Sequence, residues 1–361
     1  MSPPVVILKN FERYLISPAN TVRAAMERLN SRDIEYQFQI VCDEANRLLG
    51  TITDGDIRRA LLRNVALSDP VTRAMNPAPM FGRVDSVEEN RNRLLALSVP
   101  TSFLPVVDEA GVVREIEVLS NRRPVKYCAL VMAGGFGRRL GAHTQSKPKP
   151  LLPVGDRPIL EHLLERLEQT DVSEIYIAVH YLADQIEEFV NARQRRVPIH
   201  VLREHEPRGT AGAIGMLPCG LARPLMVLNG DVVTKLDLDA FLDFHASHIF
   251  DASIVVAQHR VTIPYGVIRH GEQGQFFGID EKPTLENFVA AGIYLLSPAF
   301  RDLVGPDESI DMPQLLERGR AKALKVGLFP IHEYWIDIGR PNDLETAGQD
   351  FQAGFAKGRA L

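Results

Sequence analysis

The feature that most constrains this chain is a glycine-rich turn placed directly after a buried strand. An apolar run over 126–132 predicts the strand, and Gly134, Gly135 and Gly137 follow it. Glycines let the backbone approach a phosphate closely and point several N–H groups at it. A little further on, Lys149 has a proline on either side, which restricts where its ammonium can go. Together these elements predict a phosphate site at the end of a strand.

Strand and helix patterns alternate after this turn. The sequence predicts helices over 158–170, 183–192 and 211–217, and strands over 175–179, 198–202 and 225–228. Strand-rich sequence follows over 252–296, then short strands over 326–329 and 334–338, and a last helix from Asn342. This order predicts an α/β fold with a Rossmann-like, mixed but mostly parallel sheet flanked by helices.

The first 120 residues contain an internal repeat. Short segments near 21–22, 29 and 41–45 match segments 65 positions later, and each copy reads as a helix, a strand and an acidic turn. The first copy continues into a strand, a turn and a helix, whereas the second continues only into a strand. We therefore expect a small α+β domain over 1–122, a linker near 121–124, and a larger domain over 125–361.

Charge and composition exclude several classes of protein. The 361 residues include 41 basic and 46 acidic side chains, for a net charge of −5, which does not suit a nucleic-acid partner. The start of the chain lacks the pattern of a signal peptide, and no apolar run is long enough to cross a bilayer. The sequence thus predicts a soluble, cytoplasmic protein with no membrane partner.

The larger part resembles the sugar-1-phosphate nucleotidyltransferases, also called sugar-nucleotide pyrophosphorylases. The resemblance rests on the motif from Gly134 to Leu140 and on the Pro-Lys-Pro element around Lys149. It implies an enzyme that joins a sugar 1-phosphate to a nucleoside triphosphate and releases pyrophosphate, with Mg²⁺ as cofactor. By the same resemblance, Arg139 grips the triphosphate and Lys149 holds the α-phosphate.

The resemblance also implies a set of nucleotide-binding residues. They are Ala133, Gly134, Gly135, Gly137, Arg138, Gly209, Thr210 and Ala211. Arg138 stands where the family usually has threonine. The run from Glu206 to Ala213 is most similar to the guanylyltransferase branch, which favours GTP and leaves UTP, CTP and dTTP open. Thr210 has an alternative role as the N-cap of a helix.

Two carboxylates are candidates for the metal. Asp231 follows the strand over 225–228, and ligand sites in open α/β sheets lie at such strand ends. The resemblance implies that Asp231 and Asp337 bind Mg²⁺, which prefers oxygen ligands. The alternatives are a turn-forming Asp231 and a capping Asp337. The chain's one tryptophan, Trp335, is expected to pack beneath this site.

Five residues are candidates for the sugar side. They are Gly266, Glu281, Lys282, Ala291 and Gly292. The resemblance implies that Glu281 accepts from sugar hydroxyls and that Lys282 is catalytic, pairing with the sugar phosphate. The alternative for the Glu281–Lys282 pair is an exposed pair of charges before a proline turn.

The first repeat copy resembles a CBS motif, and 1–122 resembles a tandem CBS pair. That resemblance implies an adenine nucleotide whose phosphate and ribose contact Thr53 and Asp56, and regulation of the larger domain. CBS pairs often associate, so a homodimer is expected. The alternative is that Thr53 and Asp56 only cap a helix.

Two other classes compete with a transferase. One is a nucleotide sensor with a catalytically weakened transferase body, which would fit the departures from the family pattern at Arg138 and Ala290. A sensor, however, has no need of all four intact residues: Lys149, Asp231, Lys282 and Asp337. A dinucleotide-binding oxidoreductase would need G-x-G-x-x-G and an acidic residue ~20 positions later, and the glycine spacing here differs.

Overall fold

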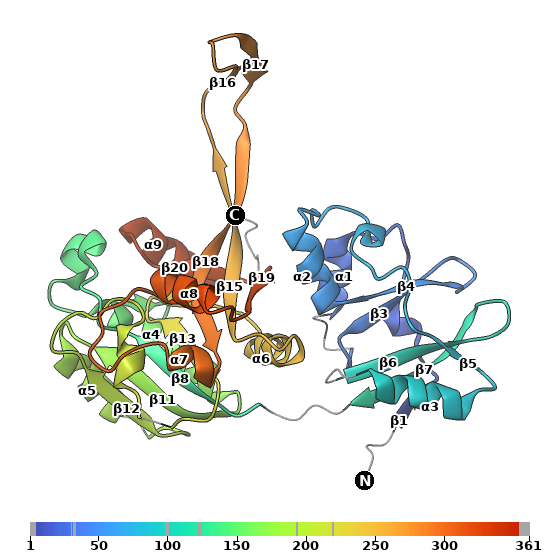
Figure 1. The fold of residues 1–361 in the computed structure, drawn as a ribbon, viewed down its shortest axis with the longest axis horizontal. Coiled ribbons are helices and arrows are strands. Elements are labelled where there is room, and N and C mark those ends of the chain that lie inside the picture. The colour runs from blue at the N-terminus through green and yellow to red at the C-terminus, as the bar shows by residue number, and fades with distance from the viewer. Residues whose placement is uncertain are drawn as a thin grey trace. The chain divides into compact units, whose positions relative to one another are not determined.

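The computed structural model describes residues 5–29, 31, 34–97, 101–120, 125–192, 194–218 and 220–353. The chain divides into two compact units, Met1–Pro124 and Val125–Leu361, which Figure 1 shows in blue-to-cyan and in green-to-red. Each unit is treated below by itself. The linker predicted over 121–124 lies outside the described residues.

The N-terminal unit repeats one helix–strand–strand arrangement. The first copy consists of α1 (Val22–Leu29), β3 (Phe38–Cys42) and β4 (Leu48–Thr53), and the second of α3 (Val87–Ala96), β6 (Thr101–Val107) and β7 (Val113–Ser120). The first copy alone continues into α2 (Asp54–Leu62). The shorter elements are β1 (Val5–Leu8), η1 (Glu12–Tyr14), β2 (Leu15–Ile16), η2 (Val71–Arg73) and β5 (Gly82–Arg83). The helices α1 and α3 begin 65 positions apart, and so do the strands β4 and β7, as the sequence repeat predicts.

The two copies share one core. They form a three-stranded sheet, β2-β3-β4, and a four-stranded sheet, β1-β7-β6-β5. Phe38 and Phe103, which are equivalent in the repeat, stack with ring centroids 4.1 Å apart. Apolar residues from both copies, such as Ile40 and Ile116, are fully buried in the same cluster. The repeat therefore buries each copy's apolar face against the other.

The C-terminal unit is built on a seven-stranded mixed sheet in the order β12-β11-β8-β13-β18-β15-β19. Its strands are β8 (Tyr127–Met132), β11 (Val172–Val179), β12 (Ile199–Arg203), β13 (Leu225–Asn229), β15 (Ala252–Thr262), β18 (Thr284–Leu296) and β19 (Val326–Ile331). Four neighbouring pairs are parallel and the two pairs that involve β18 are antiparallel. The predicted mixed, mostly parallel sheet is confirmed.

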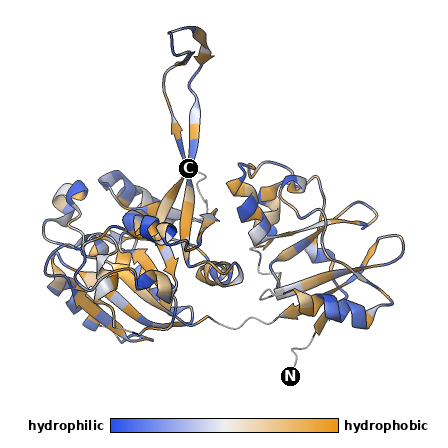
Figure 2. Ribbon diagram, in the orientation of Figure 1, coloured by the Kyte–Doolittle hydropathy of each residue, from blue (hydrophilic) through white to orange (hydrophobic). Residues whose placement is uncertain are grey.

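Helices cover both faces of this sheet. They are α4 (Ile159–Glu168), α5 (Ala183–Asn191), α6 (Leu238–Ser247), α7 (Pro298–Arg301) and α8 (Met312–Ala321). The other helical elements of this unit include α9 (Pro341–Gln352) and the 3₁₀ turns η3 (Arg138–Thr144) and η4 (Lys149–Leu151). The sheet strands are largely apolar and the helices have mixed faces (Figure 2). Leu130 and Val131 are adjacent, fully buried and on opposite faces, so the centre of the sheet is covered on both sides. Within the described residues, no helix has both the length and the apolarity to cross a membrane.

The structure corrects one predicted element and refines another. The helix predicted over 211–217 is a short 3₁₀ turn, η5 (Gly212–Met216), because two glycines and close packing leave no room for regular α-helix. The strand predicted over 334–338 is β20 (Trp335–Asp337), and it pairs with β14 (Val232–Thr234) in a separate two-stranded sheet. A further small sheet joins β9 (Pro153–Val154) and β10 (Arg157–Pro158).

A two-stranded ribbon projects from the sheet (Figure 1). β15 pairs with β19 only as far as Ala257, and beyond it β15 has β18 as its ladder partner up to Thr262. The ribbon ends in the hairpin of β16 (Val267–His270) and β17 (Phe276–Asp280). We call residues 258–288 the arm.

Two ion pairs on α4 differ in burial and allow a matched test. Glu161 is 4% exposed and accepts two hydrogen bonds from Arg195, at 3.0 and 2.8 Å. Glu165, on the next turn, is 39% exposed and pairs with Arg157. Breaking a buried pair leaves an uncompensated buried charge, whereas an exposed pair contributes little.

We expect Glu161→Gln to lower the free energy of unfolding by about 3 kcal/mol, because Arg195 loses its charged partner in a buried setting. Glu165→Gln, the control, should lower it by less than about 1 kcal/mol. Urea denaturation of both variants measures the difference. Equal losses in the two variants would contradict this account.

Candidate active site

The site begins where β8 and β13 end side by side. These parallel strands pair through Met132 and Asn229, and both chains then turn at the same edge of the sheet. Gly230 lies so close to β8 that a Cβ atom there would come within 2.8 Å of the Met132 carbonyl oxygen. The close approach holds Asp231 beside the glycine-rich turn that follows β8. This is the sheet edge at which ligand sites of open α/β folds lie.

A buried lysine meets two carboxylates at this edge. Lys149 is 8% exposed, and its Nζ donates to Asp231 Oδ2 and lies 4.0 Å from Asp337 Oδ1. Asp231 and Asp337 converge because β14 and β20 pair, with Val232 opposite Asp337, and because the Ile338 N–H donates to the Asp231 carbonyl at 3.1 Å. The structure thus brings together the three residues on which the predicted site depends.

Burial and the neighbouring charge affect the second carboxylate. The pKa of Asp337 is raised, first because burial disfavours its charged form and then because Asp231 repels it. Lys149 and Arg139 act in the opposite direction. An extra positive charge at this point would therefore relieve a repulsion that these side chains only partly offset.

An oxygen of Asp231 fits a metal ion. Asp231 Oδ1 is buried and has no hydrogen-bond partner among the described residues, while Oδ2 accepts from Lys149. A buried carboxylate oxygen without a donor costs free energy, and a cation would satisfy it. No group of three or more His, Cys, Asp or Glu side chains suited to a metal occurs in the described part of the chain. A pair of carboxylates fits Mg²⁺, which keeps waters and binds substrate phosphates as its other ligands.

The glycine turn reaches from this cluster toward β12. Gly137 has a φ of +64° and lies against Lys149, where a Cβ atom would come within 3.4 Å of the lysine Cβ. Arg139 lies against Gly339, two residues after Asp337. The Arg138 guanidinium instead stacks on the Phe136 ring, 5.0 Å from its centroid. Arg139 therefore faces the carboxylates, while Arg138 is engaged with Phe136.

The predicted base loop packs against a distant segment. The Thr210 N–H donates to Asp311 Oδ1 at 2.9 Å, and the Thr210 hydroxyl accepts from the Met312 N–H at 2.8 Å. Thr210 thus caps α8, not a helix of its own. Gly209 has a φ of +77°, and the buried Ala211 donates through its N–H to the Ile310 carbonyl. These contacts fix the loop's backbone beside the sheet.

Glu204 is a candidate that the sequence analysis missed. It follows β12 at the same sheet edge, is 8% exposed, and its Oε1 is buried with no hydrogen-bond partner among the described residues. Burial raises the pKa of its carboxyl. A Cβ atom on Gly134 would come within 2.6 Å of Glu204 Oε2, so the carboxylate borders the glycine turn. An acidic residue at the end of a predicted strand was the available signal.

The predicted sugar-side residues are divided between two places. Gly292, with a φ of +72°, lies against Asn229, and the Ala291 carbonyl accepts from the Trp335 indole N–H at 2.8 Å. These two residues therefore border the site, and Trp335 packs beneath it as expected. Gly266, Glu281 and Lys282 lie on the arm, where Gly266 contacts Glu281.

The arm keeps Lys282 away from the cluster in its own chain. Eight residues of β18 separate Thr284 from Gly292, and at a strand rise of ~3.3 Å per residue this is roughly 26 Å. Lys282 lies two positions beyond Thr284, in the turn outside that strand. The structure does not bring it together with Lys149, and its catalytic role stays a prediction.

Comparison with known proteins now gives the family. The family model described as "Nucleotidyl transferase" matches residues 128–354, more than half of the chain, and the CBS domain model matches residues 1–63. The chain belongs to the nucleotidyl transferase family. Its N-terminal unit includes a CBS domain.

Relatives with known names match 60% of this nucleotidyl transferase. A mannose-1-phosphate guanylyltransferase catalytic subunit beta of Danio rerio is 34% identical over 235 residues, which is 60% of this chain and 62% of the relative. Mannose-1-phosphate guanylyltransferase 1 of Arabidopsis thaliana is 35% identical over 228 residues, 60% and 63% of the two chains. The transferase thus spans about 62% of the length of these relatives.

A solved structure agrees with the fold. The crystal structure of HddC from Yersinia pseudotuberculosis matches with a TM-score of 0.50 at 25% identity, and the match covers 62% of the transferase and 99% of HddC. The shared part has the size of the C-terminal unit.

In the N-terminal unit of the transferase, Thr53 and Asp56 form a helix cap. Thr53 is the N-cap of α2, and Asp56 accepts from the Thr53 N–H at 2.9 Å and from its hydroxyl at 2.7 Å. The other Asp56 oxygen pairs with Arg59 at 2.7 Å. The capping role is therefore observed, and nucleotide binding at these residues stays a prediction.

We expect Asp337→Asn to raise the melting temperature of the transferase in EDTA, because the substitution removes a charge that burial and Asp231 disfavour. The wild-type protein should gain further stability when Mg²⁺ is added, and the variant should lose most of that gain. Thermal unfolding with EDTA and with MgCl₂ measures both effects.

Glu345→Gln on the exposed face of α9 is the control, and its response to Mg²⁺ should match that of the wild type. A Mg²⁺ response that survives Asp337→Asn undiminished would remove Asp337 from the metal site.

Proposed function

We propose that this chain transfers a nucleotidyl group from GTP to a sugar 1-phosphate, forming a GDP-sugar and pyrophosphate with Mg²⁺ as cofactor. The observation that supports this most directly is the meeting of Lys149, Asp231 and Asp337 beside the glycine turn at the carboxyl edge of the sheet. Guanylyltransferase relatives that are 34–35% identical over 60% of the chain support the same proposal.

In the proposed reaction, an oxygen of the sugar phosphate attacks the α-phosphorus of the triphosphate. A new P–O bond forms, the bond between the α-phosphorus and its bridging oxygen breaks, and pyrophosphate leaves with that electron pair. The attacking oxygen is already ionised near neutral pH, so no general base is required. The barrier is the approach of two anions, and catalysis depends on positioning and charge neutralisation.

The residues of the cluster meet these needs. Lys149 is buried and flanked by prolines, so its ammonium is held in place before the substrate arrives. Arg139 and the N–H groups of the glycine turn face the phosphates that leave. Asp231 and Asp337 would hold Mg²⁺, which when bound neutralises phosphate charge.

Glu204 supports guanine as the base. The Watson–Crick edge of guanine carries two neighbouring N–H donors, and one carboxylate can accept from both. Glu204 Oε1 is buried without a hydrogen-bond partner among the described residues, and Oε2 lies beside Gly134, at the opposite end of the glycine turn from Lys149. Uracil and thymine place a carbonyl oxygen on each side of their single N–H, so a buried carboxylate would repel them.

The remaining substrate and partner assignments are proposals of the same kind. An adenine nucleotide at the CBS domain would have to share Asp56 with the helix cap or displace it, while the N-terminus of α2 offers N–H groups to a phosphate. A homodimer is proposed below on structural grounds. The cytoplasmic location expected from the sequence is likewise a proposal.

We expect Asp231→Asn to lower turnover by at least ~100-fold while circular dichroism shows an unchanged fold, because a ligand aimed at developing phosphate charge is lost. The assay measures pyrophosphate release from a panel of triphosphates and sugar 1-phosphates with Mg²⁺. Repeating it with adenine nucleotides tests regulation. Near-normal turnover of Asp231→Asn would remove the catalytic assignment, and Asp302→Asn, an exposed control, should stay active.

We expect Glu204→Gln to lower kcat/KM for GTP by roughly 10- to 100-fold, the ~1.5–3 kcal/mol of a hydrogen bond to a charged group. A glutamine amide presents one acceptor and one donor, which fits the edge of uracil better than that of guanine. The ratio of kcat/KM for GTP to that for UTP should therefore fall. Glu188→Gln, at an exposed position of α5, is the control and should leave the ratio unchanged.

A further inference from the structure

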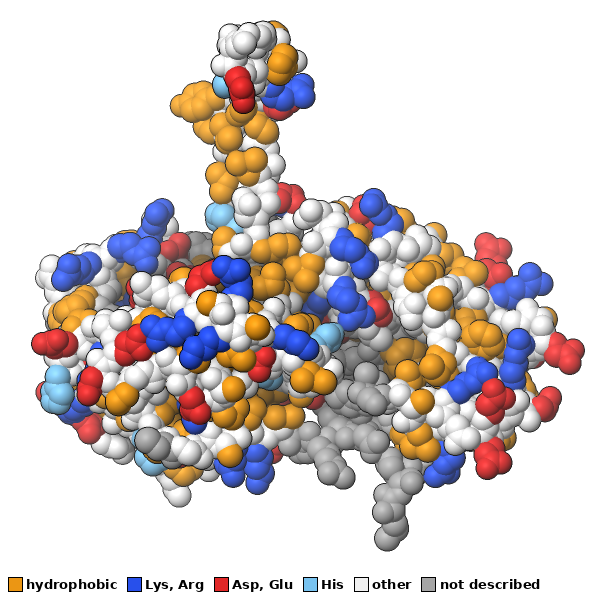
Figure 3. Space-filling model, viewed as in Figure 1, with side chains coloured by type: hydrophobic (Ala, Val, Ile, Leu, Met, Phe, Trp, Pro, Cys, Tyr) orange, Lys and Arg blue, Asp and Glu red, His pale blue; other side chains and the backbone are white. Residues whose placement is uncertain are grey.

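The arm exposes more apolar surface than a free ribbon in water can tolerate. Its exposed apolar side chains are Val261, Tyr265, Ile268, Phe276, Phe277, Ile279 and Leu285. Tyr265 is 74% exposed, and Phe276 and Phe277 are each 65% exposed. The space-filling view shows these orange side chains along the projecting part of the molecule (Figure 3). Contiguous patches of this kind mark interaction sites.

The apolar surface covers both faces of the arm. Phe276 and Phe277 are neighbours in β17, and successive side chains of a strand point to opposite faces. A two-stranded hairpin without a packing partner is only marginally stable in water. The arm therefore needs a surface that encloses it.

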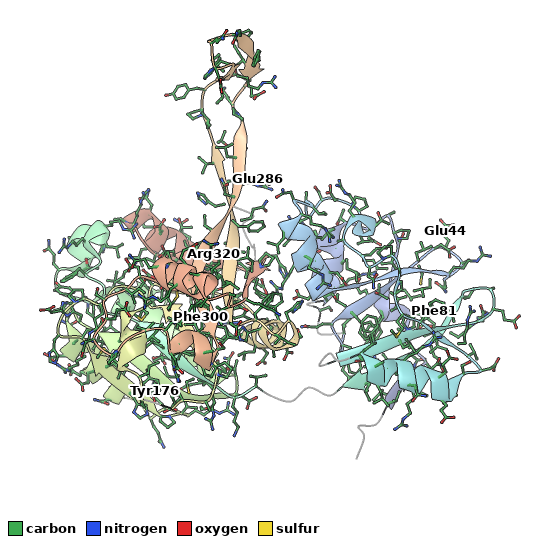
Figure 4. The ribbon with its side chains drawn as sticks, in the orientation of Figure 1. Glu44, Phe81, Tyr176, Glu286, Phe300 and Arg320 are labelled. Atoms are coloured by element: carbon green, nitrogen blue, oxygen red, sulfur yellow. The ribbon has the colours of Figure 1, made fainter. Side chains whose placement is uncertain are left out.

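The arm is too regular to bend back onto its own body. The β15–β18 ladder continues without a register shift from Val256–Ala290 to Thr262–Thr284. Cross-strand side chains reinforce it, since Glu286 accepts from Gln258 and pairs with Arg260, both at 2.8 Å. Glu286, labelled in Figure 4, lies on the ribbon where these contacts are made. Bending the ribbon anywhere between Val256 and Thr262 would break this ladder.

The residues between the ladder and the terminal hairpin of the arm offer chemistry that the catalytic body lacks. Glu281 and Lys282 follow β17, and they offer an acceptor for hydroxyl groups and a cation for a phosphate. The body holds Lys149 for one of the two reacting phosphates, and the lysine predicted for the other lies on the arm. A surface that encloses the arm and needs these groups is the active-site edge of a second copy of this chain.

We propose that two copies exchange arms, so that Glu281 and Lys282 of one chain complete the sugar-phosphate side of the site in the other. The inference rests on the proposed function for the role of these two residues. Symmetric exchange makes the two contacts identical, which is the usual closed arrangement of a dimer. Each aromatic ring buries ~150–250 Å² when covered, so two arms and their receiving surfaces reach the ~1,600 Å² of a stable interface.

Complementation between two inactive variants tests the exchange. Asp231→Asn disables the body and Lys282→Gln disables the arm, so each homodimer is expected to be inactive. Co-expression with two different affinity tags and purification on both isolates the mixed dimer. That dimer has one site with an intact body and an intact arm, so we expect about half of the wild-type turnover per dimer.

The outcomes separate the two proposals. Any of three results overturns arm exchange: a mixed dimer as inactive as its parents, a failure to isolate the mixed dimer, or a fully active Lys282→Gln. The proposed function is unaffected by these results as long as the wild type is active. An inactive wild type defeats the proposed function, and the oligomeric state then decides the exchange.

The oligomeric state is measured by sedimentation. The wild type should be a dimer, the double variant Phe276→Ser/Phe277→Ser should sediment as a monomer, and Ile249→Ser should stay dimeric. Ile249 is the matched control, because it is 78% exposed on the body outside the arm. A monomeric wild type, or a double variant that stays dimeric, overturns the exchange.

Discussion

The contact of the Lys149 ammonium with Asp231, and its approach to Asp337, organises the catalytic unit. The lysine follows the glycine turn, Asp231 follows β13, and Asp337 ends β20, so three distant segments must arrive at one edge of the sheet. Without the lysine, two carboxylates would face one another with Arg139 as the cation beside Asp337. Asp231 and Asp337 repel each other, and a bound cation would relieve that repulsion, so metal binding and local stability would be linked.

Part of this cluster could be predicted from local pattern. Asp231 follows an apolar strand run, and strand ends of open α/β sheets gather ligands, so its place follows from the sequence. Asp337 could be assigned only through family resemblance. Its position depends on the pairing of β14 with β20, a two-stranded sheet separate from the main one, and no periodicity in either short segment specifies that partner.

Other features could not be predicted because they depend on packing between distant segments. Glu204 and Glu206 look alike in sequence, but Glu204 is buried beside Gly134 and Glu206 is exposed. Thr210 matches a helix cap, but the helix that it caps begins about a hundred residues later at Met312. For the arm, the sequence predicts only strand-rich structure, because the alternation of apolar and polar side chains does not show where a strand leaves the main sheet.

The glycine turn links the two ends of the nucleotide site by backbone alone. Gly134 borders Glu204 and Gly137 borders Lys149, so four residues set the span between the group that would accept from the base and the group that would hold the α-phosphate. A Cβ atom at either glycine would come within 2.8 Å of a neighbouring side chain, so the turn has little freedom to change that span. In the proposed function, selection of the base and alignment of the phosphate would therefore both depend on the geometry of this sheet edge. The sugar side is held on a separate element, where its position depends on what the arm contacts.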